Sequence, residues 1–361
     1  MKDKMITNQD SEMGCTPQDS DIKLSLKKSE NLETLTVVSC ANEKFSCGLV
    51  MSMVSALAHS SGEFFYELIV LDGGLSEATR MSLNLKLQDV SNRIGTPFSL
   101  KFISPSKESI DKLPKRVGSW MTYARFLLAE ILPQKAVIYL DSDILCFRGI
   151  EEFYTSWDNV APIVASRDPK QTIDKDWPDE ANAAPKGVMY FNAGLILLNL
   201  DWMRCNLPLA KVEELVAKFG MDRLKFHDQT ILNYMSHGKV IEVARENNWV
   251  LATEYAMQVI DNWQSVNIHY VGRVKPWLRQ KTEARRFIPE VLYFQASKVY
   301  CIDGVKERVL DEQDLKVVRN KARFYKWFKP TRARTYQSVL KSLSRQVELE
   351  SKLTSDVFYR R

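Results

Sequence analysis

The sequence lacks several features that define large classes of protein. It has no run of 18 consecutive apolar residues, so we expect no membrane-spanning helix. Its six cysteines are scattered and form no CxxC pair, which argues against a structural zinc site and against a small disulfide scaffold. Free cysteines in apolar surroundings behave as small hydrophobic residues, so the pattern favours a reducing, cytoplasmic setting.

Glycine-rich phosphate-binding loops are also missing. The first expected strand is followed by Ala41, Asn42, Glu43 and Lys44, and neither GxGxxG nor a Walker sequence occurs. Both dinucleotide-binding and P-loop sites depend on such glycines, so the sequence disfavours these two classes. A nucleotide bound by this chain would have to place its diphosphate on a metal ion instead.

Acidic residues are absent from one long stretch near the C-terminus. Between Lys316 and Arg345 there are ten Lys or Arg and no Asp or Glu, although the whole chain carries only +5. The positive balance therefore belongs to a tail, because the rest of the chain is net acidic. Within this stretch, residues 323–329 mix basic and aromatic side chains. Basic residues attract anionic lipids and aromatic rings settle at the headgroup level, which favours contact with an anionic membrane surface through 316–345.

Two other interpretations of this tail remain open. Nucleic-acid binding also combines basic and aromatic side chains, but we consider nucleic acid an unlikely partner here. A helix that packs its aromatic residues against the body of the protein would show the same composition.

Length and composition predict one main domain with two tails. A chain of 361 residues with 45% hydrophobic and 26% charged residues is ordinary for a globular protein. Residues 1–32 are polar and have no sustained apolar periodicity, so we expect disorder, and no apolar stretch indicates a signal peptide. Residues 33–300 should form the main α/β domain, and residues 301–361 a basic, aromatic, helical tail.

Short apolar runs alternate with helical patterns through the first half of the chain. Strands are expected at 35–41, 65–71, 98–103, 136–140, 163–165 and 194–200, and helices at 45–60, from Ser76 onward, at 121–132 and at 209–219. This alternation predicts parallel pairing, with ligands bound at the carboxyl ends of the strands. The polar segment 170–186 should form a long loop, of the kind that often covers a site.

Two aspartates follow the strand at 136–140. If the extended conformation continues, Asp141 and Asp143 point to the same side. Two carboxylates that face one way repel each other unless a cation or protons lie between them, and a divalent cation with oxygen ligands would also hold diphosphate oxygens. The alternative is a solvated turn after a strand.

A second pattern lies far along the chain. His269, Gly272 and Lys275 are spaced so that an imidazole could bind a metal, a glycine could let the backbone approach, and a lysine could add charge for a diphosphate. Taken singly, His269 could be a hydrogen-bonded core histidine and Lys275 a surface lysine.

Six segments together resemble glycosyltransferase family 8, the retaining enzymes that use UDP-glucose or UDP-galactose. They occur in family order between Thr34 and Trp277, and the closest resemblance is to bacterial lipopolysaccharide glucosyl- and galactosyltransferases. The segments are 37–45, TYARF at 122–126, YLDSD at 139–143, FNAG at 191–194, DQTILN at 228–233, and 269–277. The resemblance implies a GT-A fold, a Rossmann-like mixed sheet flanked by helices, with Mn²⁺ or Mg²⁺ as cofactor.

The resemblance also implies roles for individual residues. The metal ligands would be Asp141, Asp143 and His269, and the diphosphate would contact Gly272 and Lys275. The remaining assignments are Cys40, Asn42 and Lys44 for uracil and ribose, Arg125 for sugar and diphosphate, Asn192 and Ala193 for the donor sugar, Asp228 for sugar hydroxyls, and Gln229 beneath the anomeric carbon. Family members often have Ala and Asp where this chain has Cys40 and Asn42. Outside the family context, Arg125 could be an ion-pair residue, Asn192 a turn residue, and Asp228 a helix N-terminal acid.

These observations predict a metal-dependent retaining hexosyltransferase. It would move glucose or galactose from a UDP-sugar to a glycan or glycolipid acceptor such as lipopolysaccharide core, as a cytoplasmic enzyme that contacts the inner membrane face. A transferase acting on capsule or a protein glycan, a non-catalytic sugar-nucleotide binding protein and a metal-dependent phosphohydrolase are the alternatives. Because Gln229 is a poor nucleophile, front-face attack is favoured over a covalent intermediate, for which Asp228 is the nearest acid in sequence.

Overall fold

The structure is a computed structural model. It describes residues 31–115, 119–169, 171–176, 188–251, 263–272, 275–278, 287–305, 312–330 and 355–359, and four helical positions between 333 and 340. Residues 1–30 of the predicted disordered segment and most of the predicted loop at 170–186 lie outside the described residues.

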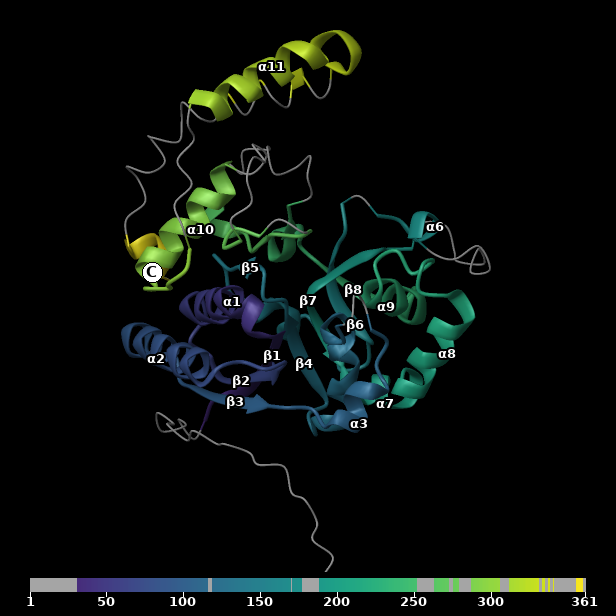
Figure 1. Ribbon diagram of the computed structural model, residues 1–361. Coiled ribbons are helices and arrows are strands. Elements are labelled where there is room, and N and C mark those ends of the chain that lie inside the picture. The colour runs from purple at the N-terminus through teal and green to yellow at the C-terminus, as the bar shows by residue number, and fades with distance from the viewer. Residues whose placement is uncertain are drawn as a thin grey trace, which may run out of the picture.

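A seven-stranded mixed sheet forms the centre of the molecule (Figure 1). Its order is β3-β2-β1-β4-β7-β6-β8, and the mixed α/β sheet predicted from the sequence is confirmed. The strands are β1 (Glu33–Ala41), β2 (Phe64–Asp72), β3 (Phe98–Ile103), β4 (Ala136–Leu140), β6 (Ile163–Arg167), β7 (Phe191–Asn199) and β8 (Val240–Val243). The strands β1 to β4 pair in parallel, as alternation with helices predicts, whereas β7 runs antiparallel to both β4 and β6.

The structure also contains a small three-stranded sheet. It has the order β5-β10-β9, formed by β5 (Ile144–Leu145), β10 (Ile268–His269) and β9 (Trp249–Val250). Strand β10 pairs antiparallel with β5 and parallel with β9. Because β5 begins one residue after Asp143, this sheet carries His269 back to the end of β4.

Helices cover both faces of the large sheet. The longer ones are α1 (Ser46–Ala58), α2 (Glu77–Ile94), α7 (Leu200–Asn206), α8 (Leu209–Phe219), α9 (Asp228–Ser236), α10 (Phe287–Val299) and α11 (Glu312–Phe328). Short turns are α3 (Lys107–Asp111), α4 (Leu128–Ile131), α5 (Glu152–Thr155) and α6 (Ile173–Asp176), with 3₁₀ segments η1 (Glu43–Phe45), η2 (Met121–Leu127), η4 (Arg245–Asn248), η5 (Trp263–Ser265) and η6 (Ser355–Phe358). The predicted helix at 121–132 is therefore mostly 3₁₀, with only its last turn α-helical.

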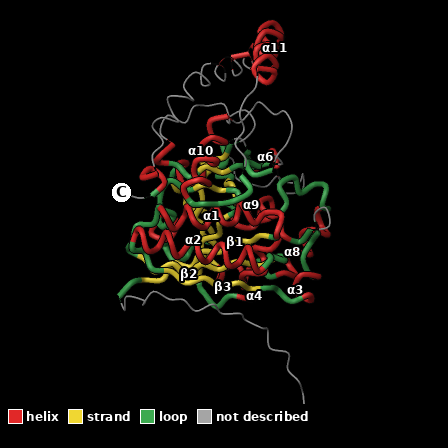
Figure 2. The backbone as a smooth tube through the Cα atoms, turned by 60° about the vertical axis from the view of Figure 1, so that its left-hand side comes forward, coloured by secondary structure: helices red, strands yellow, loops and turns green. Residues whose placement is uncertain are grey.

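Strand residues alternate between two hydrophobic layers. In β1, Leu35 and Val37 pack in one layer with α1 and α2, whereas Val38 packs in the other with η2, α4 and α7 to α9. The same period of two appears in β4, where Ile138 and Tyr139 face opposite layers. Figure 2 shows the strands as a layer between red helices. The apolar runs in the sequence thus form strands that are buried on both faces.

Helix α2 begins where the sequence predicts. The Ser76 hydroxyl accepts a hydrogen bond from the Thr79 backbone N–H, which is the expected N-cap. Of the apolar residues at Met81, Leu85 and Leu87, only Leu87 is buried; Met81 and Leu85 are 52% and 62% exposed. The helix therefore carries two large apolar side chains on its solvent face.

The C-terminal part divides between the core and the solvent. Phe358 and Tyr359 are buried in the same layer as α1 and α10. Helix α11 instead exposes Phe324, Trp327 and Phe328, and both views place it apart from the other labelled elements (Figures 1 and 2). None of the described helices combines the length and the apolar character needed to cross a bilayer. The domain boundary at residue 300 stays a prediction.

Candidate active site

The site lies at the carboxyl end of β4. Because β7 is antiparallel to β4, its first residues lie beside the last residues of β4, and the Asp141 N–H donates to the Gly194 carbonyl at 2.7 Å. Asn192 and Ala193 stand at the same edge, at the start of β7. This edge therefore brings together residues that are about fifty positions apart in the chain.

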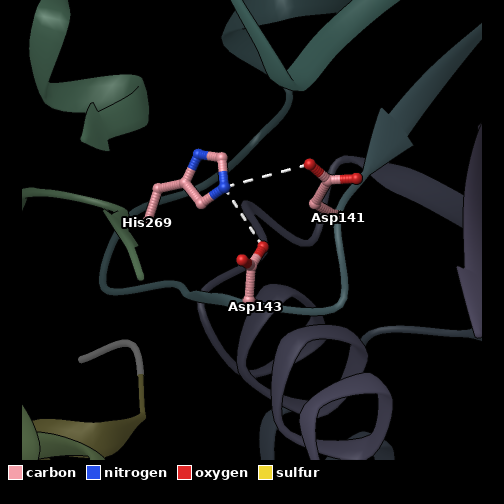
Figure 3. Close-up of side chains that lie close together, drawn as sticks. All are labelled: Asp141, Asp143 and His269. Atoms are coloured by element: carbon pink, nitrogen blue, oxygen red, sulfur yellow. Dashed lines mark ion pairs between the residues drawn. The ribbon is translucent and has the colours of Figure 1, made fainter. Parts of the chain in front are cut away.

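Two aspartates and a histidine converge here (Figure 3). Potential ligand atoms of Asp141, Asp143 and His269 all lie within 4.8 Å of one another. The His269 Nε2 atom is 3.1 Å from Asp143 Oδ1 and 3.8 Å from Asp141 Oδ2. The structure thus brings the three predicted metal ligands together.

Asp141 and Asp143 converge, but the predicted extended conformation of this segment was wrong. Strand β4 ends at Leu140, and Ser142 and Asp143 form a turn rather than a continued strand. The turn reverses the chain into β5, so both carboxylates reach the same imidazole from different backbone directions. Alternation of side chains along a strand is not what aligns them.

The charge balance at this cluster fits a cation. Burial raises the pKa of Asp141 to about 6, even though the charge of Arg125 opposes the shift. Burial would also raise the pKa of Asp143, but Lys275 and His269 hold that pKa well below its ordinary value. Two carboxylate groups and one imidazole can hold a divalent cation, which would remove the cost of ionising Asp141.

A glycine makes room for the imidazole. A Cβ atom at Gly194 would lie 2.1 Å from His269 Cε1 and 2.6 Å from its Nδ1. Any other residue at this strand position would therefore push the ring away from Asp143. The presence of glycine at position 194, in the segment FNAG, is thus explained by the space that the His269 ring needs, which the sequence alone does not show.

The predicted diphosphate residues lie next to the same carboxylates. The Lys275 ammonium forms an ion pair with Asp143 and donates to the Tyr270 carbonyl at 2.9 Å. Gly272 has φ of 90°, a left-handed conformation that favours glycine. Lys275 is only 9% exposed, so it is not the surface lysine of the alternative interpretation.

Arg125 is the centre of a buried charge network. Its guanidinium contacts Asp141 at 3.1 Å and Asp228 at 2.8 Å, and it donates to the Ala193 carbonyl. The same group lies 4.1 Å from the centre of the Tyr139 ring. Arg125 is 5% exposed and forms buried ion pairs, as the alternative interpretation describes, while its contact with a sugar or diphosphate stays a prediction. The guanidinium group of Arg125 thus links the end of β4, the start of β7 and the start of α9.

The predicted sugar-binding residues form a second, neutral network. The Gln229 Oε1 atom accepts from Asn192 Nδ2 at 3.1 Å and from the Ala193 N–H at 3.0 Å. The Gln229 Nε2 atom donates to the Tyr190 hydroxyl at 3.3 Å. Asn192 is therefore more than a turn residue, because its amide joins β7 to α9.

The predicted uracil and ribose residues lie around the end of β1. The Cys40 sulfur is 4.0 Å from the Met121 sulfur, and Lys44 is exposed on η1. The buried Asn42 Oδ1 atom has no hydrogen-bond partner among the described residues. The contact of Asn42 with uracil or ribose stays a prediction.

Sequence reasoning missed Asn248. This residue is 1% exposed, and its Oδ1 atom lies 3.1 Å from His269 Nδ1. It belongs to none of the six segments, and no motif spacing relates it to His269. Only the pairing of β9 with β10 brings the two together.

A mixed sheet with this acidic centre at the end of a central strand is the architecture of a GT-A type glycosyltransferase, and comparison with solved structures agrees. The galactosyltransferase LgtC, in complex with donor and acceptor sugar analogs, superposes with a TM-score of 0.58 at 24% identity, covering 77% of this chain and 98% of that one. The bifunctional glycosyltransferase WbbM gives 0.58 at 16% identity, covering 82% and 53%. Both show the fold that the sequence resemblance implies.

The family follows from the sequence comparison. Residues 36–281 match glycosyl transferase family 8, so the chain belongs to this family and is an enzyme. A lipopolysaccharide 1,3-galactosyltransferase of Salmonella typhimurium is 29% identical over 183 residues, which are 47% of this chain and 53% of that enzyme. A lipopolysaccharide 1,2-glucosyltransferase of Escherichia coli is 24% identical over 269 residues, which are 69% and 75%. The chain thus spans about half the length of the first relative and three quarters of the second.

Proposed function

We propose that the chain is a metal-dependent retaining hexosyltransferase that moves glucose or galactose from a UDP-sugar to a glycan acceptor. The observation that carries the proposal is the convergence of Asp141, Asp143 and His269 at the end of β4, within 4.8 Å of one another. Membership of family 8 supports the reaction class. The other proposed contacts come from the end of β1 and η1, from η2, from β7 and α9, and from the segment that follows β10.

The leaving group accounts for the charges at the site. Loss of UDP develops negative charge on the β-phosphate, and the metal would supply electrostatic stabilisation there when bound. Lys275 lies beside Asp143 and is placed to add a second positive charge. Arg125, fixed by Asp141 and Asp228, presents a guanidinium that does not need to reorganise during the reaction.

The ion pair of Asp228 and the hydrogen bonds of Gln229 favour front-face attack. The Asp228 carboxylate is paired with Arg125 Nε at 2.8 Å, which reduces its nucleophilicity. The Gln229 carbonyl oxygen already accepts two N–H groups, from Asn192 and Ala193. With neither group free to attack, an oxygen of the departing UDP would accept the proton of the acceptor hydroxyl. Trapping of a glycosyl adduct on Asp228 would contradict this step.

The acceptor that we propose is the core glycan of lipopolysaccharide. Two relatives whose names state their acceptor act on lipopolysaccharide, one as a galactosyltransferase and one as a glucosyltransferase. Transfer to a capsule or protein glycan is the alternative.

A donor screen tests the proposal. The purified chain is incubated with radiolabelled UDP-glucose or UDP-galactose and Mn²⁺, with and without truncated lipopolysaccharide acceptors, and released UDP and labelled product are measured. We expect metal-dependent hydrolysis of one donor without acceptor and faster UDP release with the right acceptor. Binding of UDP with no turnover under any condition would instead support a sugar-nucleotide binding protein.

We also propose that α11 binds an anionic membrane surface at the inner membrane face. Phe324, Trp327 and Phe328 are 64%, 83% and 75% exposed, and basic residues flank them along the helix. Large exposed rings beside lysines and arginines suit the headgroup region of an anionic bilayer. A glycolipid acceptor lies at such a surface, so this contact would hold the site near its acceptor.

Vesicle sedimentation tests this contact. Serine at Phe324, Trp327 and Phe328 together is expected to lower binding to phosphatidylglycerol vesicles at least tenfold, because the inserted rings are lost. Serine at Met81 and Leu85, which are also exposed, is the matched control and should leave binding unchanged. Substitution is preferable to truncation because Phe358 and Tyr359 belong to the core. Equal binding by the two variants would contradict the proposal.

A further inference from the structure

A chain of buried side-chain amides leads from Gln229 to His269. Gln229 accepts from Asn192, Asn192 accepts from Asn248, and Asn248 meets His269 Nδ1, with distances of 3.1, 3.0 and 3.1 Å. Asn192, Asn248 and His269 are between 1% and 8% exposed, so water competes little for these bonds. The chain connects the predicted sugar-binding residues to the predicted metal ligand.

Backbone N–H groups fix the direction of this chain. The Asn192 atom that accepts the Gly194 N–H at 3.0 Å must be the oxygen. The NH₂ group in that place would set one hydrogen-bond donor against another. The same oxygen faces Asn248 at 3.0 Å, so the Asn248 atom that meets it must be the NH₂ group. Asn248 therefore turns its oxygen toward His269. The Ala193 N–H fixes Gln229 in the same way.

The consequence falls on the imidazole. An amide oxygen can only accept, so His269 Nδ1 must carry the hydrogen in its bond with Asn248. The nitrogen left to face Asp141 and Asp143 is Nε2, which lies 3.8 and 3.1 Å from their oxygens. Ring nitrogens that bind metals are commonly oriented by a hydrogen-bond acceptor at the other nitrogen.

The small sheet holds Asn248 at the right place. Asn248 ends η4 and directly precedes β9, and β9 pairs with β10 through Trp249 N–H to Asn267 O at 2.7 Å and Leu251 N–H to His269 O at 2.9 Å. These two backbone bonds tie the residues that follow Asn248 to the strand that carries His269. Gly194 has no Cβ atom and therefore leaves space for the His269 ring.

We propose that Asn248 is a positioning residue that holds His269 with Nδ1 protonated and Nε2 directed at a divalent cation between Asp141 and Asp143. The proposal rests on the proposed metal-dependent function, and it assigns a role to a residue outside the resembling segments. Asn248 acts through His269 and does not itself touch the metal or the sugar nucleotide.

The test compares two substitutions at Asn248 with Mn²⁺ and UDP as probes. Asn248→Leu removes the acceptor in similar volume, and we expect Mn²⁺ affinity in the presence of UDP to fall about 10- to 100-fold. Asn248→Asp keeps an acceptor for Nδ1 but loses the NH₂ group that donates to Asn192. Because a carboxylate can orient a metal-bound histidine, we expect its affinity to fall less than that of Asn248→Leu and the imidazole nitrogen to stay on the metal. Calorimetry measures affinity, and electron spin-echo modulation of bound Mn²⁺ reports directly whether an imidazole nitrogen is coordinated.

The control is the neighbouring amide. Asn247 is fully buried, yet its side chain makes no hydrogen bond to the described residues, so Asn247→Leu should leave the nitrogen signal unchanged. A wild-type nitrogen signal that persists in Asn248→Leu, or that disappears in Asn248→Asp, would overturn the role of Asn248 alone. Absence of that signal in the wild type would overturn the proposed metal site itself.

Discussion

Replacing Asp143 with asparagine is expected to lower Mn²⁺-dependent kcat/KM by about 10²–10³, the cost typical of losing one group that stabilises developing charge. Asp143 contacts both His269 and Lys275, so the substitution removes one proposed metal ligand and leaves the nearly buried lysine without its carboxylate. The measurement is the initial rate of UDP release across a Mn²⁺ titration. A raised Mn²⁺ requirement should accompany the lost rate.

An exposed aspartate provides the control for this substitution. Asp111 is 54% exposed at its side chain and pairs with Lys115 in an i,i+4 contact, so Asp111→Asn should keep the wild-type rate. If Asp143→Asn retained both the wild-type rate and the wild-type Mn²⁺ dependence, the metal site would lie elsewhere.

Replacing Arg125 with methionine is expected to reduce the free energy of unfolding by about 3–5 kcal/mol, because it leaves buried carboxylates without their partner. Arg125 is 5% exposed and contacts Asp141, Asp228 and the Ala193 carbonyl. Urea unfolding followed by tryptophan fluorescence measures the effect. Arg125→Lys keeps the charge but cannot reproduce the planar fork, so it should be intermediate.

Two further variants show whether the loss comes from the unpaired carboxylates. Asn at Asp228 in the Arg125→Met background should recover part of the stability, because it removes one of the buried charges. Arg148→Met breaks an ion pair with Glu152 whose side chains are about one-third exposed, and should cost less than 1 kcal/mol. An Arg125→Met protein as stable as Arg148→Met would show that the buried network contributes little.

The strands could be predicted because their residues carry a clear physical signal. β-branched and aliphatic runs such as those in β1 and β4 must be buried on both faces, and the structure places alternate residues in two layers. The reversed direction of β7 could not be predicted in this way, because a strand buried on both faces has the same composition in either direction. The pairing partners of β7, rather than its own residues, decide its direction.

Part of the site could also be predicted, but from the chemistry and order of individual residues rather than from apolar runs. Asp141 and Asp143 were singled out as paired carboxylates and His269 by its spacing to Gly272 and Lys275, and the family resemblance joined them into one site. Long-range pairing of β5 with β10 explains why they meet. Asn248 could not be found, because asparagine at a buried position has no spacing that relates it to a histidine twenty-one residues later. The return of Phe358 to the core was also missed, because residues 301–361 were assigned as a whole to a basic, aromatic, helical tail.

The reversed strand has a consequence for how this enzyme can diversify. Because β7 starts at the catalytic edge, the segment leading into Phe191 borders the site, while the connection after Asn199 leaves from the opposite edge. Insertions or exchanges before Phe191 can therefore reshape acceptor selection without changing the strand itself. Comparable changes after Asn199 would lie at the opposite edge of the sheet and should affect specificity less.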